Sequence, residues 1–295
     1  MGRGFHGARE RLGVVALACC AWLSVGVTAA IAIALFQETI LFFGQVSYLQ
    51  FFLDTEWTPL FWDKHYGIWP LVCGTVITTT VSLAVAIPAG TIIALFLAEW
   101  APRVVRMMVK PLLEILSGIP TIVFGYFAVS VVTPVLRAFF PSIPGFNALS
   151  AGIVMGIMML PLVATLVEDA LTVVPQSYRE ASYALGAGRF TTMVRVTLPA
   201  AAGGVTAAAI LALSRALGET MIVTIAAGQQ PRLSLNPLQA VETLTAFIAQ
   251  VVMGDTPYGS IEHQAIFVVG SLLFIGTLTL NVASIWIRER FAMDR

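Results

Sequence analysis

The sequence predicts an all-α membrane protein whose chain crosses the bilayer six times. Of its 295 residues, 58% are hydrophobic and 11% are charged, whereas soluble domains carry about 25% charged residues. Long stretches without an ionisable side chain recur along the chain, and about 20 apolar residues cross a bilayer core. Sixteen basic residues balance sixteen acidic ones, so we expect no nucleic acid among the partners.

The six spans are predicted from the gaps between ionisable residues. Five gaps are long enough to cross a membrane: residues 12–37, 66–98, 115–136, 138–167 and 264–287. A sixth span, at about 203–228, contains only Arg215 and Glu219 as ionisable residues. The first gap is much longer than the apolar core of a signal peptide, which has about 7–15 residues. We therefore expect it to be a retained transmembrane helix.

The distribution of Lys and Arg predicts which side each segment faces, because cytoplasmic loops are enriched in them. With the N-terminus inside, only Lys64, Arg137 and Arg232 fall in external segments. We therefore expect both termini in the cytoplasm. The predicted segments are a cytoplasmic N-terminus (1–11), a first transmembrane helix (12–37), an external segment (38–66), a core with five transmembrane helices (67–287) and a cytoplasmic C-terminus (288–295).

Two external segments are expected to be structured. Residues 45–62 interleave aromatic side chains with Asp54 and Glu56, which suits a helix lying among lipid headgroups. The second segment, 229–262, carries apolar residues at helical spacing within 238–252. That apolar face either caps the bundle or contacts an external partner, and the sequence leaves both open.

Several chemistries are disfavoured by residues that the spans lack. No histidine lies in a predicted span, where an intramembrane protease would need one. The three cysteines have no metal-ligand spacing, and neither lysine follows the glycine pattern of a phosphate-binding loop. We therefore expect no metal site and no ATP or other cofactor bound by this chain itself.

A cytoplasmic loop at 168–202 carries the first functional motif. Pro175 and Gln176 begin a short predicted helix that ends at Gly186, a residue typical of helix C-termini. A second amphipathic helix then stops at Pro199. A rigid helix–turn–helix outside the membrane suits the transmission of force from another protein, although it also serves to stabilise a bundle.

The spacing in this loop resembles the signature of ABC importer permeases. Glu180-Ala181-Ser182 is followed by Gly186 and then by Val196-Thr197-Leu198-Pro199. Serine at the third position and valine in place of isoleucine are the two departures from that signature. In that family the loop contacts the ATPase subunit, which implies this role for Glu180, Ala181, Ala184, Leu185 and Gly186. The resemblance also implies the architecture of type I importers.

Arg215 and Glu219 form the second motif. At helical spacing Glu219 lies one turn from Arg215 on the same face. A charge at the centre of a membrane helix costs about 2.5–3.5 kcal/mol on insertion scales, so it is normally paired or faces a cavity. Either the two residues form an ion pair that holds helices together, or Arg215 meets an anion that crosses the bundle. A guanidinium matches a tetrahedral oxyanion with two parallel hydrogen bonds.

The stretch from Ser214 to Met221 resembles the PstC family, permease subunits of phosphate importers. Three further segments carry this resemblance, which extends from about residue 50 to the end of the chain: 52–59, 118–125 and 159–161. It implies a heterodimer with a PstA-like permease, an ATPase dimer that uses ATP and Mg, and an external phosphate-binding protein. It also implies a multi-pass protein of a bacterial or archaeal plasma (inner) membrane, in contact with lipid.

The function expected on these grounds is that of a membrane permease subunit that forms half of the pathway of an ATP-driven phosphate importer. Phosphate would pass Arg215. Glu219 would pair with Arg215 while the pathway holds no anion, or it would accept a hydrogen bond from protonated phosphate. A permease for another oxyanion, such as sulfate, molybdate or phosphonate, remains open. A channel or secondary carrier working without ATP, and an intramembrane enzyme, are disfavoured by the loop motif and by the missing histidines.

Overall fold

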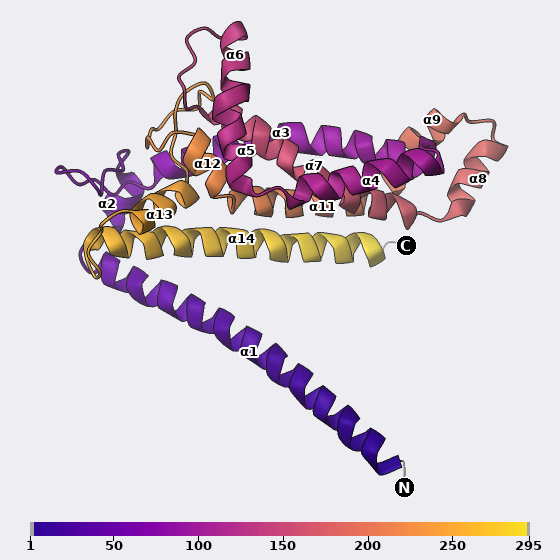
Figure 1. Ribbon diagram of the computed structural model, residues 1–295, viewed down its shortest axis with the longest axis horizontal. Helices are drawn as coiled ribbons and strands as arrows, with labels where there is room; N and C mark the ends of the chain where they lie inside the picture. The colour runs from indigo at the N-terminus through magenta and orange to yellow at the C-terminus, as the bar shows by residue number, and fades with distance from the viewer. Residues whose placement is uncertain (1–2, 294–295) are drawn as a thin grey trace.

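The computed structural model describes residues 3–293 and consists of helices joined by loops, of which the longest are 54–68 and 227–243 (Figure 1). The first half of the chain forms α1 (Arg3–Phe43), α2 (Tyr48–Leu53), α3 (Trp69–Leu95), η1 (Phe96–Trp100), α4 (Arg103–Gly118), α5 (Thr121–Phe127), η2 (Ala128–Val132) and α6 (Thr133–Phe139). The second half forms α7 (Ala148–Thr172), α8 (Gln176–Ala184), α9 (Arg189–Thr192), η3 (Met193–Thr197), α10 (Leu198–Ala200), α11 (Ala202–Leu217), α12 (Met221–Ala226), α13 (Leu244–Met253) and α14 (Ile261–Met293).

Within the described residues, five helical stretches are long and apolar enough to cross a bilayer. They are Gly13–Phe43, Trp69–Trp100, Thr121–Phe139, Ala148–Thr172 and Ile261–Trp286. A sixth candidate is the pair Arg189–Ala200 and Ala202–Leu217, which bends by 69° at Ala201. The all-α fold with up to six spans is therefore confirmed.

The centre of the bundle is the parallel pair of α3 and α7. Small residues allow the two helices to approach closely: a Cβ atom at Gly152 would lie 2.6 Å from the Cβ of Val81, and one at Gly156 would lie 2.7 Å from the carbonyl oxygen of Ser82. Asn147 caps α7, because its side chain accepts a hydrogen bond from the Ser150 amide at 2.7 Å. This close pair forms the support on which the shorter helices pack.

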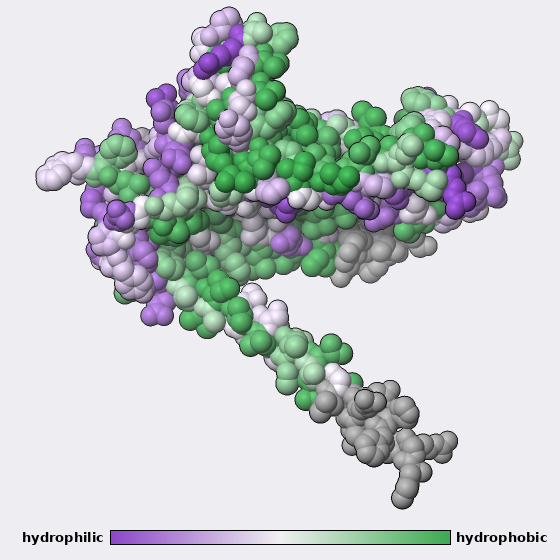
Figure 2. All heavy atoms as spheres, viewed as in Figure 1, coloured by the Kyte–Doolittle hydropathy of each residue, from purple (hydrophilic) through white to green (hydrophobic). Residues whose placement is uncertain are grey.

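Helices α1 and α14 contact each other at one end only. The Thr39 and Ser271 hydroxyls lie 2.9 Å apart, and the Gln45 amide donates to Gln264 at 3.0 Å. Towards its N-terminus α1 diverges from the bundle (Figure 1), and its side chains are exposed and apolar over residues 13–30 (Figure 2). An apolar surface of this kind suits lipid or another membrane helix.

The prediction of one span over 115–136 is wrong in its boundaries. The chain leaves the helical conformation at Ile119, which has ψ 129°, and Pro120 caps the next helix. Proline lacks an amide proton and disfavours a helical residue before it. Residues 115–118 therefore belong to α4, and α5 and α6 turn away from it (Figure 1).

The predicted span at 203–228 is also interrupted. Helix α11 ends at Leu217 and α12 begins at Met221, so residues 218–220 form a break. The hydroxyl of Thr245, in α13, donates to the Glu219 carbonyl at 2.6 Å. The Thr245 hydroxyl thus satisfies the Glu219 carbonyl, which would accept a bond within the helix if the helix were continuous.

The predicted headgroup helix within 45–62 is present only as α2. Asp54 ends it, since its side chain accepts a hydrogen bond from the Glu56 amide at 3.1 Å and stabilises a turn. Residues 57–66 then form a hairpin-like loop, which the Thr58 amide closes by donating to the His65 carbonyl at 2.9 Å. Trp62 projects from this loop with its side chain fully exposed.

Candidate functional site

Arg215 lies in the last turn of α11, directly before the break at residues 218–220. Its side chain is exposed, and among residues 13–286, whose side chains the structure describes, it has no ion-pair partner. Cations near a helix C-terminus interact favourably with the helix dipole. The break therefore offers a partly compensated position for a charge inside an apolar segment.

The expectation that Glu219 lies on the same helical face as Arg215 is wrong, because α11 ends between them. The Glu219 carboxylate instead accepts a hydrogen bond from the Ile222 amide at 3.3 Å, at the beginning of α12. The residue is buried, with 8% of its surface exposed. The anionic side chain thus compensates the N-terminus of one short helix, while the cationic one compensates the C-terminus of the other.

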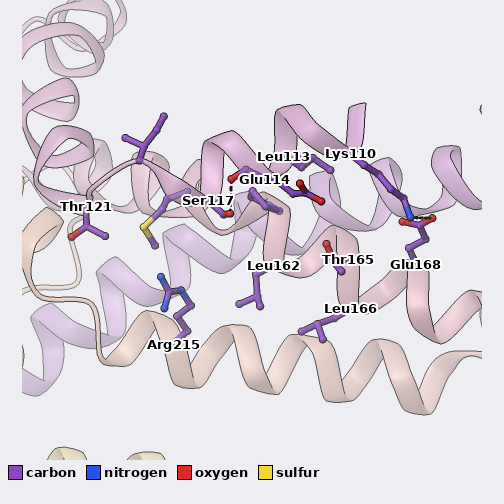
Figure 3. A pocket seen from close by; sticks show the side chains of 13 residues that line it. Lys110, Leu113, Glu114, Ser117, Thr121, Leu162, Thr165, Leu166, Glu168 and Arg215 are labelled. Carbon is purple, nitrogen blue, oxygen red and sulfur yellow. Dashed lines mark hydrogen bonds and ion pairs between the residues drawn. The ribbon is translucent and has the colours of Figure 1, made fainter. Parts of the chain in front are cut away.

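Arg215 points into a hollow between α4, α7 and α11, which we call the central hollow (Figure 3). It has a volume of about 480 Å³, within the range of small-molecule sites, about 300–1,000 Å³. Its polar lining residues are Lys110, Glu114, Ser117, Thr121, Thr165, Glu168 and Arg215. A second hollow of about 510 Å³ shares Arg215 with it and adds Ser214, Glu219 and Asn281. Arg215 and Glu219 therefore face one space without contacting each other as an ion pair.

An ion pair between two helices lies at the end of the central hollow away from Arg215 (Figure 3). The Lys110 Nζ atom, on α4, lies 3.0 Å from the Glu168 carboxylate on α7. The Glu168 side chain is 8% exposed and that of Lys110 is 48% exposed. Since α4 has no buried residue, this pair is a principal polar link between α4 and the core.

The sequence does not predict Lys110, Glu114 and Glu168 as part of this hollow. Lys110 is expected in a cytoplasmic loop and Glu168 at the beginning of the 168–202 loop, whereas Glu168 lies inside α7. A signal was present in α4, where polar residues recur at spacings of three and four and so share one helix face. That series comprises Arg103, Arg106, Lys110, Glu114 and Ser117.

The 168–202 motif forms a compact turn between α8 and α9. Gly186 has φ +82°, which glycine adopts readily. Its amide donates to the Tyr183 carbonyl at 2.9 Å, and the Ala187 amide donates to the Ser182 carbonyl at 3.1 Å. These two bonds form a Schellman motif, so the prediction that α8 ends at Gly186 is confirmed.

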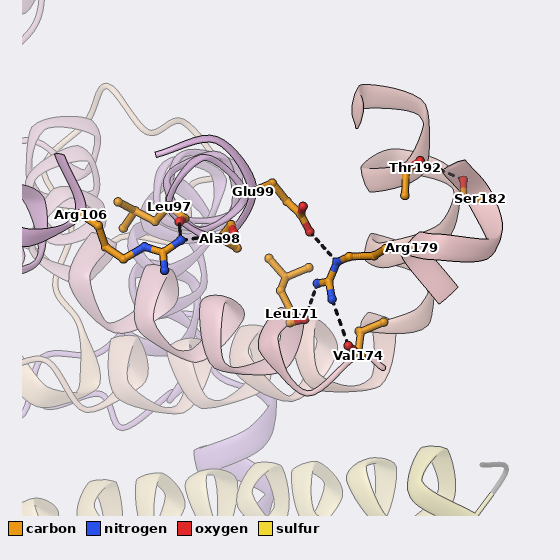
Figure 4. Close-up of polar contacts among 9 residues, drawn as sticks. All are labelled: Leu97, Ala98, Glu99, Arg106, Leu171, Val174, Arg179, Ser182 and Thr192. Carbon is orange, nitrogen blue, oxygen red and sulfur yellow. Dashed lines mark hydrogen bonds and ion pairs between the residues drawn. The ribbon is translucent and has the colours of Figure 1, made fainter. Parts of the chain in front are cut away.

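Serine at the third motif position has a visible role. The Ser182 hydroxyl is buried and lies 2.9 Å from the Thr192 hydroxyl of α9, which joins the two helices (Figure 4). The residues predicted to contact an ATPase all have exposed surfaces: Glu180, Ala181, Ala184, Leu185 and Gly186. Leu185 is 89% exposed, and it forms an apolar tip on the segment.

Arg179 fastens this segment to the bundle (Figure 4). Its Nε atom donates to the Glu99 carboxylate at 2.9 Å, and its two terminal nitrogens donate to the carbonyls of Val174 and Leu171 at 3.1 and 3.0 Å. The Arg179 and Glu99 side chains are each 15% exposed. A shift of α8 therefore pulls directly on α7 and on η1.

Comparison with known proteins identifies relatives over most of the chain. The family described as "Binding-protein-dependent transport system inner membrane component" matches residues 86–292. The probable ABC transporter permease protein YqgH of Bacillus subtilis is 33% identical over 268 residues, which cover 90% of this chain and 86% of that protein. The phosphate transport system permease proteins PstC of Xylella fastidiosa and Mesorhizobium japonicum are 32% and 31% identical, covering 81% and 78% of this chain and 78% and 75% of theirs.

Among solved structures, an inward-facing form of the MetNI methionine ABC transporter has a similar fold. The match has a TM-score of 0.55 at 20% sequence identity, and it covers 76% of this chain and 94% of that chain. This likeness supports the arrangement of helices in a type I ABC importer permease.

The Lys110–Glu168 pair yields a stability prediction. In the Lys110→Met variant Glu168 stays buried without its partner; breaking a fully buried pair costs about 3–5 kcal/mol, and the exposure of Lys110 reduces this to about 1–2 kcal/mol. We expect a lower thermal unfolding midpoint in detergent. Lys64→Met is the matched control, because Lys64 forms an exposed pair with Glu262. Equal midpoints for the two variants would contradict the role of Lys110.

Proposed function

This chain belongs to the family of binding-protein-dependent transport system inner membrane components, and we propose that it is the permease subunit through which an ATP-driven importer moves inorganic phosphate. Membership makes it a permease component of an ABC importer, a class of subunit without an ATP site of its own. The choice of phosphate is the proposal, and PstC-named relatives support it.

The observation that carries the proposal is Arg215 in the central hollow. A guanidinium without an ion-pair partner, facing a space large enough for a small anion, has two parallel N–H donors available for an oxyanion. Lys110 lies at the far end of the same hollow. Because Lys110 is already paired with Glu168, Arg215 is the positive charge that the hollow offers to an anion, while apolar side chains such as Leu162 form the walls.

Glu219 faces the second hollow, where it accompanies Arg215. We assign it the role of hydrogen-bond acceptor for a protonated phosphate, since a carboxylate repels a fully ionised anion. Sulfate carries no proton at neutral pH and offers no such donor. The amide bond from Ile222 occupies one position on the carboxylate and leaves acceptor capacity free.

We further propose that the α8 end of the bundle is cytoplasmic and contacts the ATPase. Helix α1 begins and α14 ends toward the α8 end (Figure 1), and the predicted cytoplasmic charges fall on these segments. The exposed tip at Leu185 provides an apolar contact, and Arg179 transmits its movement to α7. The other end, with α2 and α13, then faces the external binding protein.

In this scheme the pathway is shared with a PstA-like second permease. Two ATPase subunits, which use ATP and Mg, close on ATP and draw the α8 segments together. The permease pair then opens toward the loaded phosphate-binding protein, and hydrolysis restores the inward-facing state. A permease for sulfate, molybdate or phosphonate would share this scheme and differ in the groups that face the anion.

Arg215 variants test the pathway. We expect Arg215→Gln to reduce uptake of labelled phosphate at least tenfold in cells, because the anion loses its charge-assisted hydrogen bonds. Arg215→Lys should restore part of the uptake by charge alone. Membrane levels and co-purification of the ATPase serve as assembly controls. Undiminished uptake in Arg215→Gln would contradict the pathway, and loss of assembly would assign the arginine a structural role.

Gly186 tests the proposed role of α8, α9 and the turn between them, which we call the coupling segment, in contacting the ATPase. Gly186→Asp places a charged residue at φ +82° and disturbs the turn beside Leu185, so we expect reduced uptake and weaker co-purification of the ATPase without loss of membrane insertion. Gly188→Asp is the matched control: it adds the same charge two residues away, at an extended N-cap position of α9 that accepts aspartate. Normal uptake and assembly in Gly186→Asp would remove the segment from the mechanism.

A further inference from the structure

A third cavity lies at the α13 end of the bundle and shares no lining residue with the central hollow. It has a volume of about 320 Å³ and is lined by three segments: the loop after α2, residues 229–232, and the beginning of α13 with Glu242 before it. We call it the outer cavity, because the proposed orientation makes this end external. Its lining is built from groups of both polar and aromatic character.

Two residues that line the outer cavity each carry a buried polar atom without a hydrogen-bond partner. The Glu242 side chain has an unpaired Oε1 atom and the Trp57 indole has an unpaired Nε1 atom, and no described residue bonds either. Glu242 is 2% exposed and Trp57 is 1% exposed. A buried unpaired polar group costs about 1–3 kcal/mol, so both atoms would be stabilised by a hydrogen-bond partner that enters the cavity.

The backbone holds both residues firmly. Trp57 pairs with Tyr66 through a backbone bridge, and its ring packs edge-on against Phe247 with centroids 5.0 Å apart. The carbonyl of Glu242 lies so close to α3 that a Cβ atom at Gly74 would come within 2.1 Å of it. The floor of the cavity is therefore preorganised.

The opposite wall depends on an unusual turn. Gly228 has φ +111° and Gln229 has φ +46°, a left-handed conformation that is rare for a residue with a side chain. This turn carries Gln229, Gln230 and Arg232 to the rim of the cavity, where their side chains are exposed. Strain of this kind concentrates at functional sites.

The donor set of the outer cavity selects an anion. An indole N–H and a guanidinium can only donate hydrogen bonds, and the rim amides can donate as well. Burial raises the pKa of Glu242 to about 8, so its carboxyl group is protonated at neutral pH and donates too. A metal cation would be repelled by the positive charge of Arg232, and the cavity does not offer it a set of charged ligands.

We propose that the outer cavity is a capture site for a tetrahedral oxyanion, inorganic phosphate, which it holds before the anion reaches Arg215. The inference rests on the proposed function for the identity of the anion. Trp57, Glu242 and Arg232, one from each of the three lining segments, bind it, and the rim glutamines complete the site. A phospholipid headgroup offers the same oxygens, and the experiment separates the two sources.

The test is equilibrium binding of labelled inorganic phosphate to the purified full-length chain in nanodiscs, with Arg215→Gln present throughout so that the pathway arginine makes no contribution. We expect saturable binding that Trp57→Phe and Arg232→Gln each weaken about tenfold. Trp62→Phe and Arg137→Gln are the matched controls. Trp62 is fully exposed on the same loop, and Arg137 does not line the cavity; neither control should change the affinity.

A pH series isolates Glu242. Arg232 is the other charged side chain that lines the cavity from the described elements around it, and it keeps its charge over the series. Between pH 7 and 9 the Glu242 carboxyl loses its proton and places a negative charge beside the anion. Binding should therefore fall more steeply in the parent than in Glu242→Gln, while the titration of phosphate itself is common to both.

Three results would overturn the inference. The first is parent-like binding by Trp57→Phe and Arg232→Gln, and the second is the absence of saturable binding. The third is displacement of labelled phosphate by glycerophosphocholine as effectively as by unlabelled phosphate, which would assign the site to a lipid headgroup. Uptake by the assembled importer separates this inference from the proposed function. Continued phosphate uptake alongside a failed binding test overturns the capture site alone, whereas an importer that moves no phosphate overturns the function.

Discussion

A permanent charge in an apolar span requires a compensating environment, and the arrangement of this bundle depends on how Arg215 obtains one. The chain ends α11 two residues after the arginine and begins α12 after a break, so that helix termini of opposite polarity flank residues 218–220. Arg215 lies at the carboxyl end of one helix, and Glu219 caps the amino end of the next. Because a helix end compensates each charge, Arg215 and Glu219 do not need to form an ion pair with each other. The guanidinium therefore stays available to a passing anion.

The same break connects the two ends of the molecule. The Thr245 hydroxyl, on α13, donates a hydrogen bond to the Glu219 carbonyl. The backbone amide of Asn147, the residue that caps α7, donates to the Ala226 carbonyl at the end of α12. At the other end of α7, the Leu171 carbonyl accepts a hydrogen bond from Arg179 of the coupling segment. A continuous series of packed and hydrogen-bonded elements therefore runs from α8 to the segment that carries Glu219, which is a physical basis for the proposed link between ATP use and access to the pathway.

Features fixed by local chemistry were predictable from the sequence, and features fixed by packing were not. Charge-free stretches identified the membrane class, and Gly186 identified the end of α8, because each depends on a few neighbouring residues. The interruptions at Ile119–Pro120 and at 218–220 were missed: a hydropathy pattern counts apolar residues and does not register that Pro120 or Thr245 redirects the backbone. The roles of Glu168 and Glu242 were missed for a further reason. Glu168 stands at the edge of a predicted span and indicates its boundary, and Glu242 stands within an external segment; only the fold shows that Glu168 pairs with Lys110 and that Glu242 is buried beside Trp57.

Transport through this chain requires the central hollow to be a water-accessible path for an anion. The most direct measurement is thiol accessibility in a variant whose three native cysteines are replaced by alanine, using a membrane-impermeant anionic thiol reagent on everted vesicles. Ser117→Cys and Thr165→Cys, which line the hollow on α4 and α7, should react rapidly and be protected by phosphate, whereas Leu278→Cys on the apolar surface of α14 should react slowly. Reaction of Ser117→Cys and Thr165→Cys no faster than Leu278→Cys would contradict the claim.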